Sequence, residues 1–218
     1  MLKKQTRQAS GGGAEMAVRR GRPPGDPEVK RVELLKAATS TIAEEGYANA
    51  SLRKVAQRAG YTTGAVTYYF ANKEELVLAL VESRFDRYDA MLEGIQAEAA
   101  IEALFERWLR LTTSDPEFWP VMSELLAHAR HDPALAAVYK QRYGRFREVY
   151  TSIIAAGQVR GTVRDDISAD LLADQLSAMA DGWALLFPLE PERFTPGRVR
   201  ELVDAAVALI APVPGARR

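Results

Sequence analysis

Apolar positions recur with helical spacing along most of the chain. In residues 30–46 they recur every three or four positions and stop before a glycine, which is typical of an amphipathic helix; the stripe consists of Val32, Leu35, Ala38, Thr39, Ile42 and Ala43. The same spacing continues beyond Leu80, where no run alternates with the period of two that indicates a strand. The pattern predicts an all-α fold, with a three-helix head followed by a larger helical bundle.

Cap residues and prolines set the boundaries of the expected helices. Asp115, Asp132 and Thr195 each precede a proline, and a short polar cap followed by proline is typical of a helix start. We therefore expect helices at about 30–46, 51–59, 62–70, 73–95, 99–113, 116–130, 133–157, 168–187 and 196–211. Residues 1–29 are rich in Gly, Arg and Pro and hold few apolar side chains, so we expect a disordered basic tail there.

Residues 51–70, SLRKVAQRAGYTTGAVTYYF, have the pattern of two short helices joined by a tight turn. Ser51 can cap the first helix, Gly60 follows its last periodic residue, and Thr62 or Thr63 offers the next cap. A turn of about three residues forces the second helix to cross the first steeply and to project its N-terminal residues outward. This is the geometry of a helix-turn-helix, although an exposed helix without a binding role fits the same residues.

The outer side of the second helix carries short hydroxyls and phenols, and only Val66 and Phe70 are needed for burial. Short side chains let a helix backbone approach base edges in a DNA groove, and tyrosine can reach phosphate oxygens. Asn72 and Glu75 then form a capping-box variant that starts a third helix. Lys73 lies in its first turn, which is unfavourable for a cation unless a phosphate lies opposite; a solvated lysine is the alternative.

The stretch LLKAATSTIAEEGYANASLRKVAQRAGYTTGAVTYYFANKEELVLAL resembles the N-terminal DNA-binding domain of the TetR family of transcriptional regulators. The capped helix, its alanine pair, Gly60, Gly64, the aromatic pair before Phe70 and the NKEEL helix start carry the resemblance. One departure is Thr67, where the family often has an aromatic residue. If that aromatic residue normally touches the DNA backbone, Tyr68 must carry more of the contact in this chain.

The resemblance implies which residues contact double-stranded DNA. The groove-facing residues would be Thr62, Thr63, Ala65 and Thr67, with Gly64 permitting close approach of the backbone. Tyr68 and Lys73 would bind phosphates, and Ser51 and Arg53 would lie near the DNA backbone at the edge of the site. The expected target is a palindromic operator with half-sites about one helical turn apart, or a multiple of it.

Charge is distributed unevenly, although the formal net charge is zero. Through Lys73 the chain holds 13 Lys and Arg against 6 Asp and Glu, whereas the remainder holds 16 against 23. A basic head and an acidic body agree with DNA binding by the head. Within the tail, RRGRPPG from Arg19 to Gly25 resembles an AT-hook, whose arginines enter the narrow minor groove of A·T-rich DNA; a merely solvated basic tail is the alternative.

We expect residues 30–75 to form the DNA-binding domain and residues 76–212 the body. The segments HDPALAAVYKQRYGRFREVYTSIIAAGQVRG and ADQLSAMADGWALLF resemble the C-terminal domain of choline-responsive and related repressors of the same family. In that family the last two long helices pair across a twofold axis, which implies a homodimer here. Core or dimer contacts would then come from Leu171, Leu172, Leu176, Met179, Trp183, Leu202, Val203, Ala206, Leu209 and Ile210. A monomer with these residues all turned inward is the alternative, but a lone head reads only one half-site.

Aromatic residues cluster in the body, and at helical spacing such residues usually form core. A bundle with several Trp, Tyr and Met residues can also enclose an apolar cavity with a few polar groups. We expect the lining of a cavity for a small-molecule effector to include Trp108, Trp119, Met122, Tyr143 and Phe146. The resemblance does not transfer the identity of the effector.

The chain has no cysteine, which excludes disulfides and thiol-based redox sensing. MLKK at the start is not followed by an apolar run, and no stretch reaches the roughly eighteen apolar residues of a membrane span. We therefore expect a cytoplasmic protein without a membrane partner.

A metal-dependent helical-bundle enzyme is the alternative from another functional class. Glu124, His128, His131 and Asp132 can lie together near one helix end, but the chain has only these two histidines, and a metal site needs further ligands from a facing helix. A nucleophile–base pair, a P-loop and a dinucleotide fingerprint are all absent. We expect no enzyme, no cofactor and no metal, but a DNA-binding transcriptional repressor released by a small-molecule effector. An activator or a constitutive DNA binder without an effector is the nearer alternative.

Overall fold

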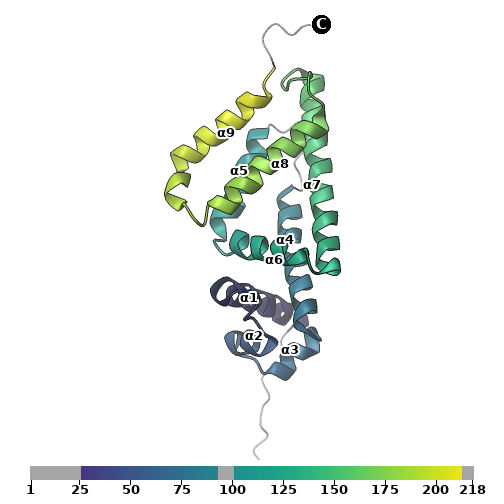
Figure 1. The fold of residues 1–218 in the computed structure, drawn as a ribbon, viewed down its shortest axis with the longest axis vertical. Coiled ribbons are helices and arrows are strands. Elements are labelled where there is room, and N and C mark those ends of the chain that lie inside the picture. The colour runs from purple at the N-terminus through teal and green to yellow at the C-terminus, as the bar shows by residue number, and fades with distance from the viewer. Residues whose placement is uncertain (1–25, 93–100, 213–218) are drawn as a thin grey trace, which may run out of the picture.

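The structure, a computed structural model, describes residues 26–92 and 101–212. Three helices form a head at one end of an elongated molecule: α1 (Pro27–Glu45), α2 (Leu52–Ala59) and α3 (Thr63–Tyr69) (Figure 1). From the head, α4 (Lys73–Leu92) runs into a body formed by α5 (Ile101–Ser114), α6 (Phe118–Ala129), α7 (Pro133–Arg160), α8 (Ala169–Leu186), the short 3-10 helix η1 (Pro191–Phe194) and α9 (Pro196–Ile210). The described residues contain no strand, which confirms the predicted all-α fold.

Side-chain caps fix the two short helices of the head. Ser51 and Thr62 each accept the backbone N–H three residues ahead, at 3.3 and 3.2 Å, so Thr62 is the cap of α3. Gly60 ends α2 in the left-handed region, at φ 72° and ψ 26°, which glycine adopts without steric cost. Val66 and Phe70 are fully buried, as the sequence predicted. The expected helix-turn-helix is therefore present.

Two helices extend past their expected ends for local reasons. α1 begins three residues early because Asp26 accepts the backbone N–H of Glu28 at 3.0 Å and Pro27 suits the first helical position. α7 continues to Arg160, where Gly161 adopts the left-handed conformation with φ 71°. The tail before residue 26, with the AT-hook-like segment, lies outside the described residues.

One expected helix start is wrong. Asp115 and the following proline do not begin α6, which starts two residues later without a side-chain cap. Asp115 instead accepts hydrogen bonds from Arg84 and Arg87 of α4, the latter at 2.7 Å. By contrast, Asp132 and Thr195 cap α7 and α9 as predicted.

A single hydrophobic core continues from the head into the body. Its fully buried side chains come from the head, from α4 and from the centre of the body; among them are Leu34, Ile42, Val55, Val66, Leu80, Val81, Phe118, Leu125, Leu135 and Ile154. Because α4 supplies residues to both parts, head and body share packed side chains as well as a covalent connection.

A second connection between head and body runs through α6. Ser40 of α1 donates to Glu117 at 3.0 Å, and the backbone N–H of Tyr47 donates to the Glu124 carboxylate at 2.6 Å. The Tyr47 ring also packs on His128, with 4.1 Å between ring centroids. We call these five residues the α1–α6 junction. They hold the end of α1 against one side of α6.

Gly46 ends α1 beside this junction and has φ 78° and ψ 157°, a conformation that is almost restricted to glycine. A Cβ at this position would lie 3.4 Å from the Glu124 carboxylate, whereas a Cβ on Gly60 would meet no atom within 4 Å. We expect Gly46→Ala to lower the free energy of unfolding by about 2–3 kcal/mol and Gly60→Ala by about 1 kcal/mol. Urea unfolding of both variants measures the difference, and equal losses would contradict this conformational explanation.

Candidate nucleic-acid interface and body cavity

The outer face of α3 lies at the end of the molecule away from the body (Figure 1). Thr62, Thr63, Gly64 and Thr67 are exposed, and Ala65 is half-buried. Tyr68 is 83% exposed, and its ring meets the ring of Tyr69 edge-on, with 5.1 Å between centroids. The structure thus brings all the residues expected to face a groove onto one accessible helix.

The threonine hydroxyls on this face keep hydrogen-bonding capacity for a partner. Thr62 uses its oxygen as an acceptor for the α3 cap, and Thr67 donates its proton to the Gly64 carbonyl at 3.1 Å. A hydroxyl has one proton and two lone pairs, so Thr62 can still donate and Thr67 can still accept. Base edges in the major groove present both kinds of group.

The basic residues of α2 differ in their freedom to bind phosphate. Lys54 is ion-paired with Glu45, and Arg58 with Glu44 of α1. Arg53 is exposed and has no ion pair among the described residues. Of the α2 cations, Arg53 therefore has the charge that is least compensated within the protein.

Lys73 is held against the α1–α6 junction. Its ammonium donates to the Tyr47 carbonyl and lies 3.9 Å from the centroid of the Tyr47 ring. Partial burial lowers the pKa of Lys73. To meet a phosphate, this side chain would have to leave Tyr47 or to share its three donors between the two partners.

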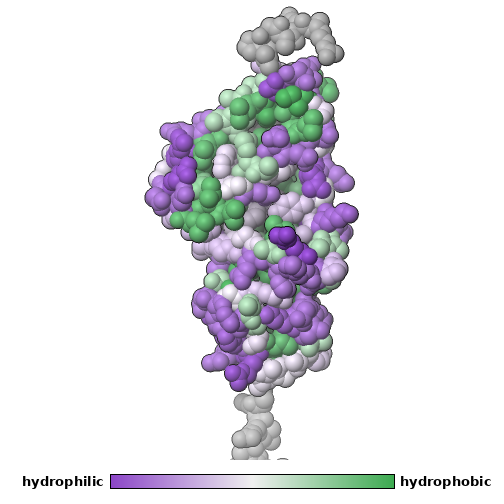
Figure 2. Space-filling model, viewed as in Figure 1, coloured by the Kyte–Doolittle hydropathy of each residue, from purple (hydrophilic) through white to green (hydrophobic). Residues whose placement is uncertain are grey.

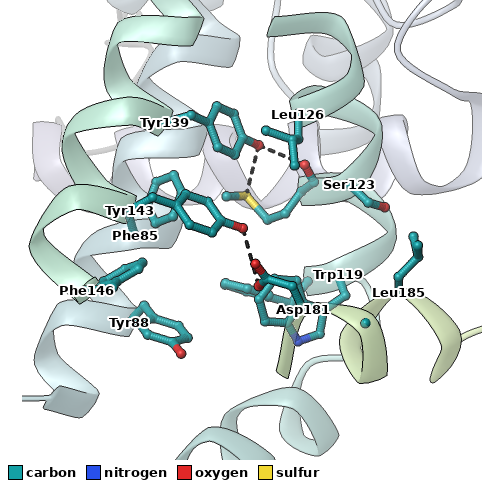
Figure 3. A pocket seen from close by; sticks show the side chains of 13 residues that line it. Phe85, Tyr88, Trp119, Ser123, Leu126, Tyr139, Tyr143, Phe146, Asp181 and Leu185 are labelled. Atoms are coloured by element: carbon teal, nitrogen blue, oxygen red, sulfur yellow. Dashed lines mark hydrogen bonds between the residues drawn. The ribbon is translucent and has the colours of Figure 1, made fainter. Parts of the chain in front are cut away.

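A cavity of about 260 Å³ lies in the body between α4, α6, α7 and α8 (Figure 3). It is lined by Phe85, Tyr88, Phe118, Trp119, Met122, Ser123, Leu126, Tyr139, Tyr143, Phe146, Asp181, Gly182 and Leu185. Four of the five side chains that the sequence suggested for such a cavity therefore meet at its wall.

Trp108 is the exception, since it does not line this cavity. It is buried against Trp119 and Trp183, with ring centroids 6.3 and 6.4 Å away. It lines a small separate void beside Phe187 and Val199 instead. Trp108 belongs to the packing that joins α5 to α8 and α9, away from the cavity in which it was expected from the sequence.

Sequence reasoning missed Asp181, the charged residue of the cavity. Asp181 lies on α8, and the Tyr143 hydroxyl donates to its carboxylate at 3.5 Å. Burial raises the pKa of Asp181 to about 6, although the hydrogen bond from Tyr143 acts in the opposite direction. An isolated aspartate within an amphipathic helix gives no signal that separates it from a surface residue.

The tyrosines of the cavity are neutral hydrogen-bonding groups. The Tyr139 hydroxyl donates to the Met122 carbonyl at 2.8 Å, and the Tyr88 and Tyr150 hydroxyls are 3.0 Å apart. Burial raises the pKa of Tyr88 and Tyr139, and that of Tyr150, which lies behind Tyr88 and outside this cavity's wall, to about 12. The wall of the cavity is therefore aromatic and uncharged except at Asp181.

Apolar residues on α8 and α9 divide between core and surface. Leu172, Leu176, Val203, Ala206 and Ile210 are buried, Met179, Trp183 and Leu202 are half-buried, and Leu171 and Leu209 are 55% and 62% exposed. Leu185, Leu186 and Leu189 are also exposed. Figure 2 shows hydrophobic areas on the face of the body that carries α8 and α9.

The residues considered for a metal site serve other contacts. Glu124 and His128 belong to the α1–α6 junction, and Asp132 caps α7. Within the described residues, no three His, Asp or Glu side chains come together in a group suited to a metal ion. No described helix combines the length and the apolar character needed to cross a membrane.

Two family models match the chain. The model described as "Bacterial regulatory proteins, tetR family" matches residues 34–80, which include α2 and α3. The model described as "BetI-type transcriptional repressor, C-terminal" matches residues 97–212, which is more than half of the chain.

Curated relatives at low identity cover most of the chain. The transcriptional repressor AcnR of Corynebacterium glutamicum is 28% identical over 160 residues, which is 72% of this chain and 81% of the relative. The transcriptional regulator TtgR of Pseudomonas putida is 25% identical over 198 residues, which is 86% of this chain and 94% of the relative.

Solved structures share the same arrangement of helices. A transcriptional regulator from Rhodococcus sp. Rha1 superposes with a TM-score of 0.71 at 26% identity, covering 83% of this chain and 95% of that structure. A regulator from Saccharomonospora viridis, solved in complex with choline, gives a TM-score of 0.69 at 25% identity, covering 83% and 96%.

Proposed function

The chain belongs to the TetR family and is a DNA-binding transcriptional regulator rather than an enzyme, and we propose that it is a homodimeric repressor that a small-molecule effector releases from a palindromic operator. The observation that carries this proposal is the pairing of an accessible helix-turn-helix with an aromatic cavity in one packed molecule. Such a regulator acts on chromosomal DNA, in the cytoplasm. The boundary between its two domains falls near residue 75, within the first turn of α4.

The DNA contacts that we propose come from α3 and its surroundings. Thr62, Thr63, Ala65 and Thr67 face base edges, and Gly64 permits close approach. Tyr68, with its exposed hydroxyl, binds a phosphate, and Arg53 and Ser51 lie along the DNA backbone. Lys73 is a further phosphate contact, made when its ammonium turns from the Tyr47 carbonyl to the DNA.

The second copy of the chain covers the apolar side of α8 and α9. Support comes from exposed leucines on both helices, including Leu171, Leu185 and Leu209, which a monomer would leave in water. An interface on the same patch of both subunits gives twofold symmetry, and this symmetry lets two heads read a palindrome.

The effector binds in the body cavity and acts on the head through α6. One side of α6 supplies Trp119, Met122 and Leu126 to the cavity, and another side carries Glu124 and His128 of the α1–α6 junction. A shift of α6 on binding would therefore move the contact with Tyr47. To relieve repression tenfold, the effector must favour the non-binding state by about 1.4 kcal/mol.

Selection of bound DNA from a random duplex pool tests the proposal. We expect a palindromic site to be enriched, and we expect Tyr68→Ala to weaken binding to that site at least tenfold because an exposed phosphate contact is lost. Tyr68→Phe keeps the ring and removes only the hydroxyl that would bind the phosphate, so it should weaken binding to a similar degree; unchanged binding by Tyr68→Phe would contradict a contact through the hydroxyl. Titration at several salt concentrations measures both variants.

Enrichment of a palindrome that depends on Tyr68 would support the proposed interface. If the enriched DNA is A·T-rich and binds equally well to Tyr68→Ala, another part of the chain makes the DNA contact. If no DNA sequence is enriched, the proposed operator recognition fails.

A further inference from the structure

A groove of about 500 Å³ lies where the head meets the body. Its wall comes from α1, from α4 and from the segment between α5 and α6, and Figure 1 shows α1, α4 and α6 meeting at this boundary. No described residue lines both this groove and the body cavity. We call it the head–body groove; its charged lining residues are Lys36, Arg84, Arg87, Asp115 and Glu117. Its volume is in the range of sites that bind small molecules.

Cations outnumber carboxylates in the wall of the head–body groove. Arg84 and Arg87 donate to the same oxygen of Asp115, so two guanidiniums share one negative charge. The Glu117 carboxylate accepts from the neutral Ser40 hydroxyl at 3.0 Å. Neither Glu117 nor Lys36 forms an ion pair among the described residues. Three cations and two carboxylates line the groove, which leaves one positive charge in excess.

The two arginines keep hydrogen-bond donors for a further partner. A guanidinium has five N–H donors. Arg84 and Arg87 each donate one hydrogen bond to Asp115, and neither makes another hydrogen bond to a described residue. Arg84 is buried and its guanidinium also lies 5.6 Å from the centroid of the Phe118 ring, so its position is fixed in advance. A donor that is already ordered loses little conformational freedom when it binds a ligand.

Apolar side chains line the same groove beside the cations. They include Val32 of α1, which is 61% exposed, Leu80 of α4 and Pro116. An inorganic ion would leave these side chains in contact with water, whereas an organic ligand would cover them. The lining therefore favours a ligand with both an anionic group and an apolar portion.

We propose that the head–body groove binds a small organic anion, whose carboxylate, phosphate or sulfonate group accepts hydrogen bonds from Arg84, Arg87 and Lys36. Guanidinium groups match the spacing of oxygens in such anions and bind them with charge-assisted hydrogen bonds. General attraction does not account for this preference, because the chain has no net charge and the residues after Lys73 hold 16 Lys and Arg against 23 Asp and Glu. The inference goes beyond the proposed function, since the groove is separate from the outer face of α3 and from the body cavity.

A bound anion would connect the head to the body. Lys36 belongs to α1 of the head, whereas Arg84 and Arg87 belong to the part of α4 that packs in the body. An anion held by all three cations would fix α1 against α4. This connection would add to the one that the α1–α6 junction already makes.

Calorimetric titration of the full-length protein at low salt, with two probes of nearly equal shape, tests the proposal. Benzenesulfonate is an anion, and benzenesulfonamide has the same ring and a neutral group in place of the sulfonate. We expect the anion to bind more tightly by about tenfold or more, as the loss of a charge-assisted hydrogen bond predicts. Equal affinity for the two probes, or no binding of the anion, would overturn the proposal without any mutation.

Two variants that each remove one cation locate the site. Lys36→Gln and Arg87→Gln change exposed side chains and leave Arg84 paired with Asp115, so both proteins should remain folded. We expect each to bind benzenesulfonate about tenfold more weakly. Lys140→Gln is the matched control, since it removes an equal charge from an exposed position of α7 outside the groove. If the control weakens binding as much as the two groove variants do, the anion responds to overall charge and the proposed site is wrong.

A third variant has an expected effect of opposite sign. Glu117→Gln removes a negative charge from the groove, while its amide oxygen can still accept from Ser40. Affinity for benzenesulfonate should rise by about threefold or more, and that for benzenesulfonamide should stay the same. A loss of affinity for the anion in this variant would contradict the proposed position of its charge.

These titrations contain no DNA. Binding of the anion would therefore stand even if no operator is selected. Conversely, failure of the anion to bind would reject the groove site and leave the proposed operator recognition intact.

Discussion

Replacement of Asp115 by alanine is expected to lower the free energy of unfolding by about 3 kcal/mol. The side chain of Arg84 is only 9% exposed, and its guanidinium donates to the Asp115 carboxylate. Arg87 donates to the same oxygen at 2.7 Å. Removal of the shared carboxylate leaves Arg84 buried without a counterion, which costs far more than the loss of an exposed ion pair. Urea unfolding at neutral pH measures this loss.

Asp86→Ala is the control, because Asp86 also pairs with an arginine, Arg142, but is 65% exposed. We expect it to cost less than about 1 kcal/mol. Burial opposes ionisation of Asp115, but its two arginine partners outweigh burial and hold its pKa below the ordinary value of 3.8. The stabilisation is therefore present above pH 4 and is lost as the pH falls through the lowered pKa. If the free energy of unfolding of Asp115→Ala stays below that of the unchanged protein by the same amount down to strongly acidic pH, the ion-pair explanation is contradicted.

Leu125→Ala is expected to destabilise the protein by about 3 kcal/mol, because Leu125 has no exposed surface and truncation leaves a cavity in the shared core. The adjacent Leu126 is 43% exposed and lines the body cavity, so Leu126→Ala should cost less than about 1 kcal/mol. Thermal and urea unfolding compare the two variants, which remove the same atoms from neighbouring positions of α6. Similar losses would mean that α6 is not oriented as described.

Helix starts could be predicted from sequence wherever the cap acts within its own turn. Ser51, Thr62, Asp132 and Thr195 each accept a backbone N–H two or three residues ahead. Asp115 has the same local pattern as Asp132, but two arginines about thirty residues earlier bind its carboxylate. A contact between distant segments overrides the local preference, and its strength is not visible in the sequence around Asp115.

The candidate site residues divide in the same way. The exposed face of α3 follows from helical periodicity and a resemblance to known regulators, so its members were predictable together. The cavity depends on how four helices cross, and periodicity alone cannot separate Trp119 at the cavity wall from Trp108 in the core. Asp181 was missed because its burial comes from α7 and its neighbours, and an aspartate in a helix is usually solvated.

The position of α6 has a thermodynamic consequence for a regulator of this kind. Because α6 forms part of the cavity wall and also holds the end of α1, a ligand and an operator would each bias one shared equilibrium. Coupling between two binding events is reciprocal, so an effector that weakens operator affinity tenfold must itself bind about tenfold more weakly to the DNA-bound protein. Protein on the operator would then require a higher effector concentration than free protein does. The threshold of the response would therefore depend on the number of operator sites as well as on the affinity of the cavity.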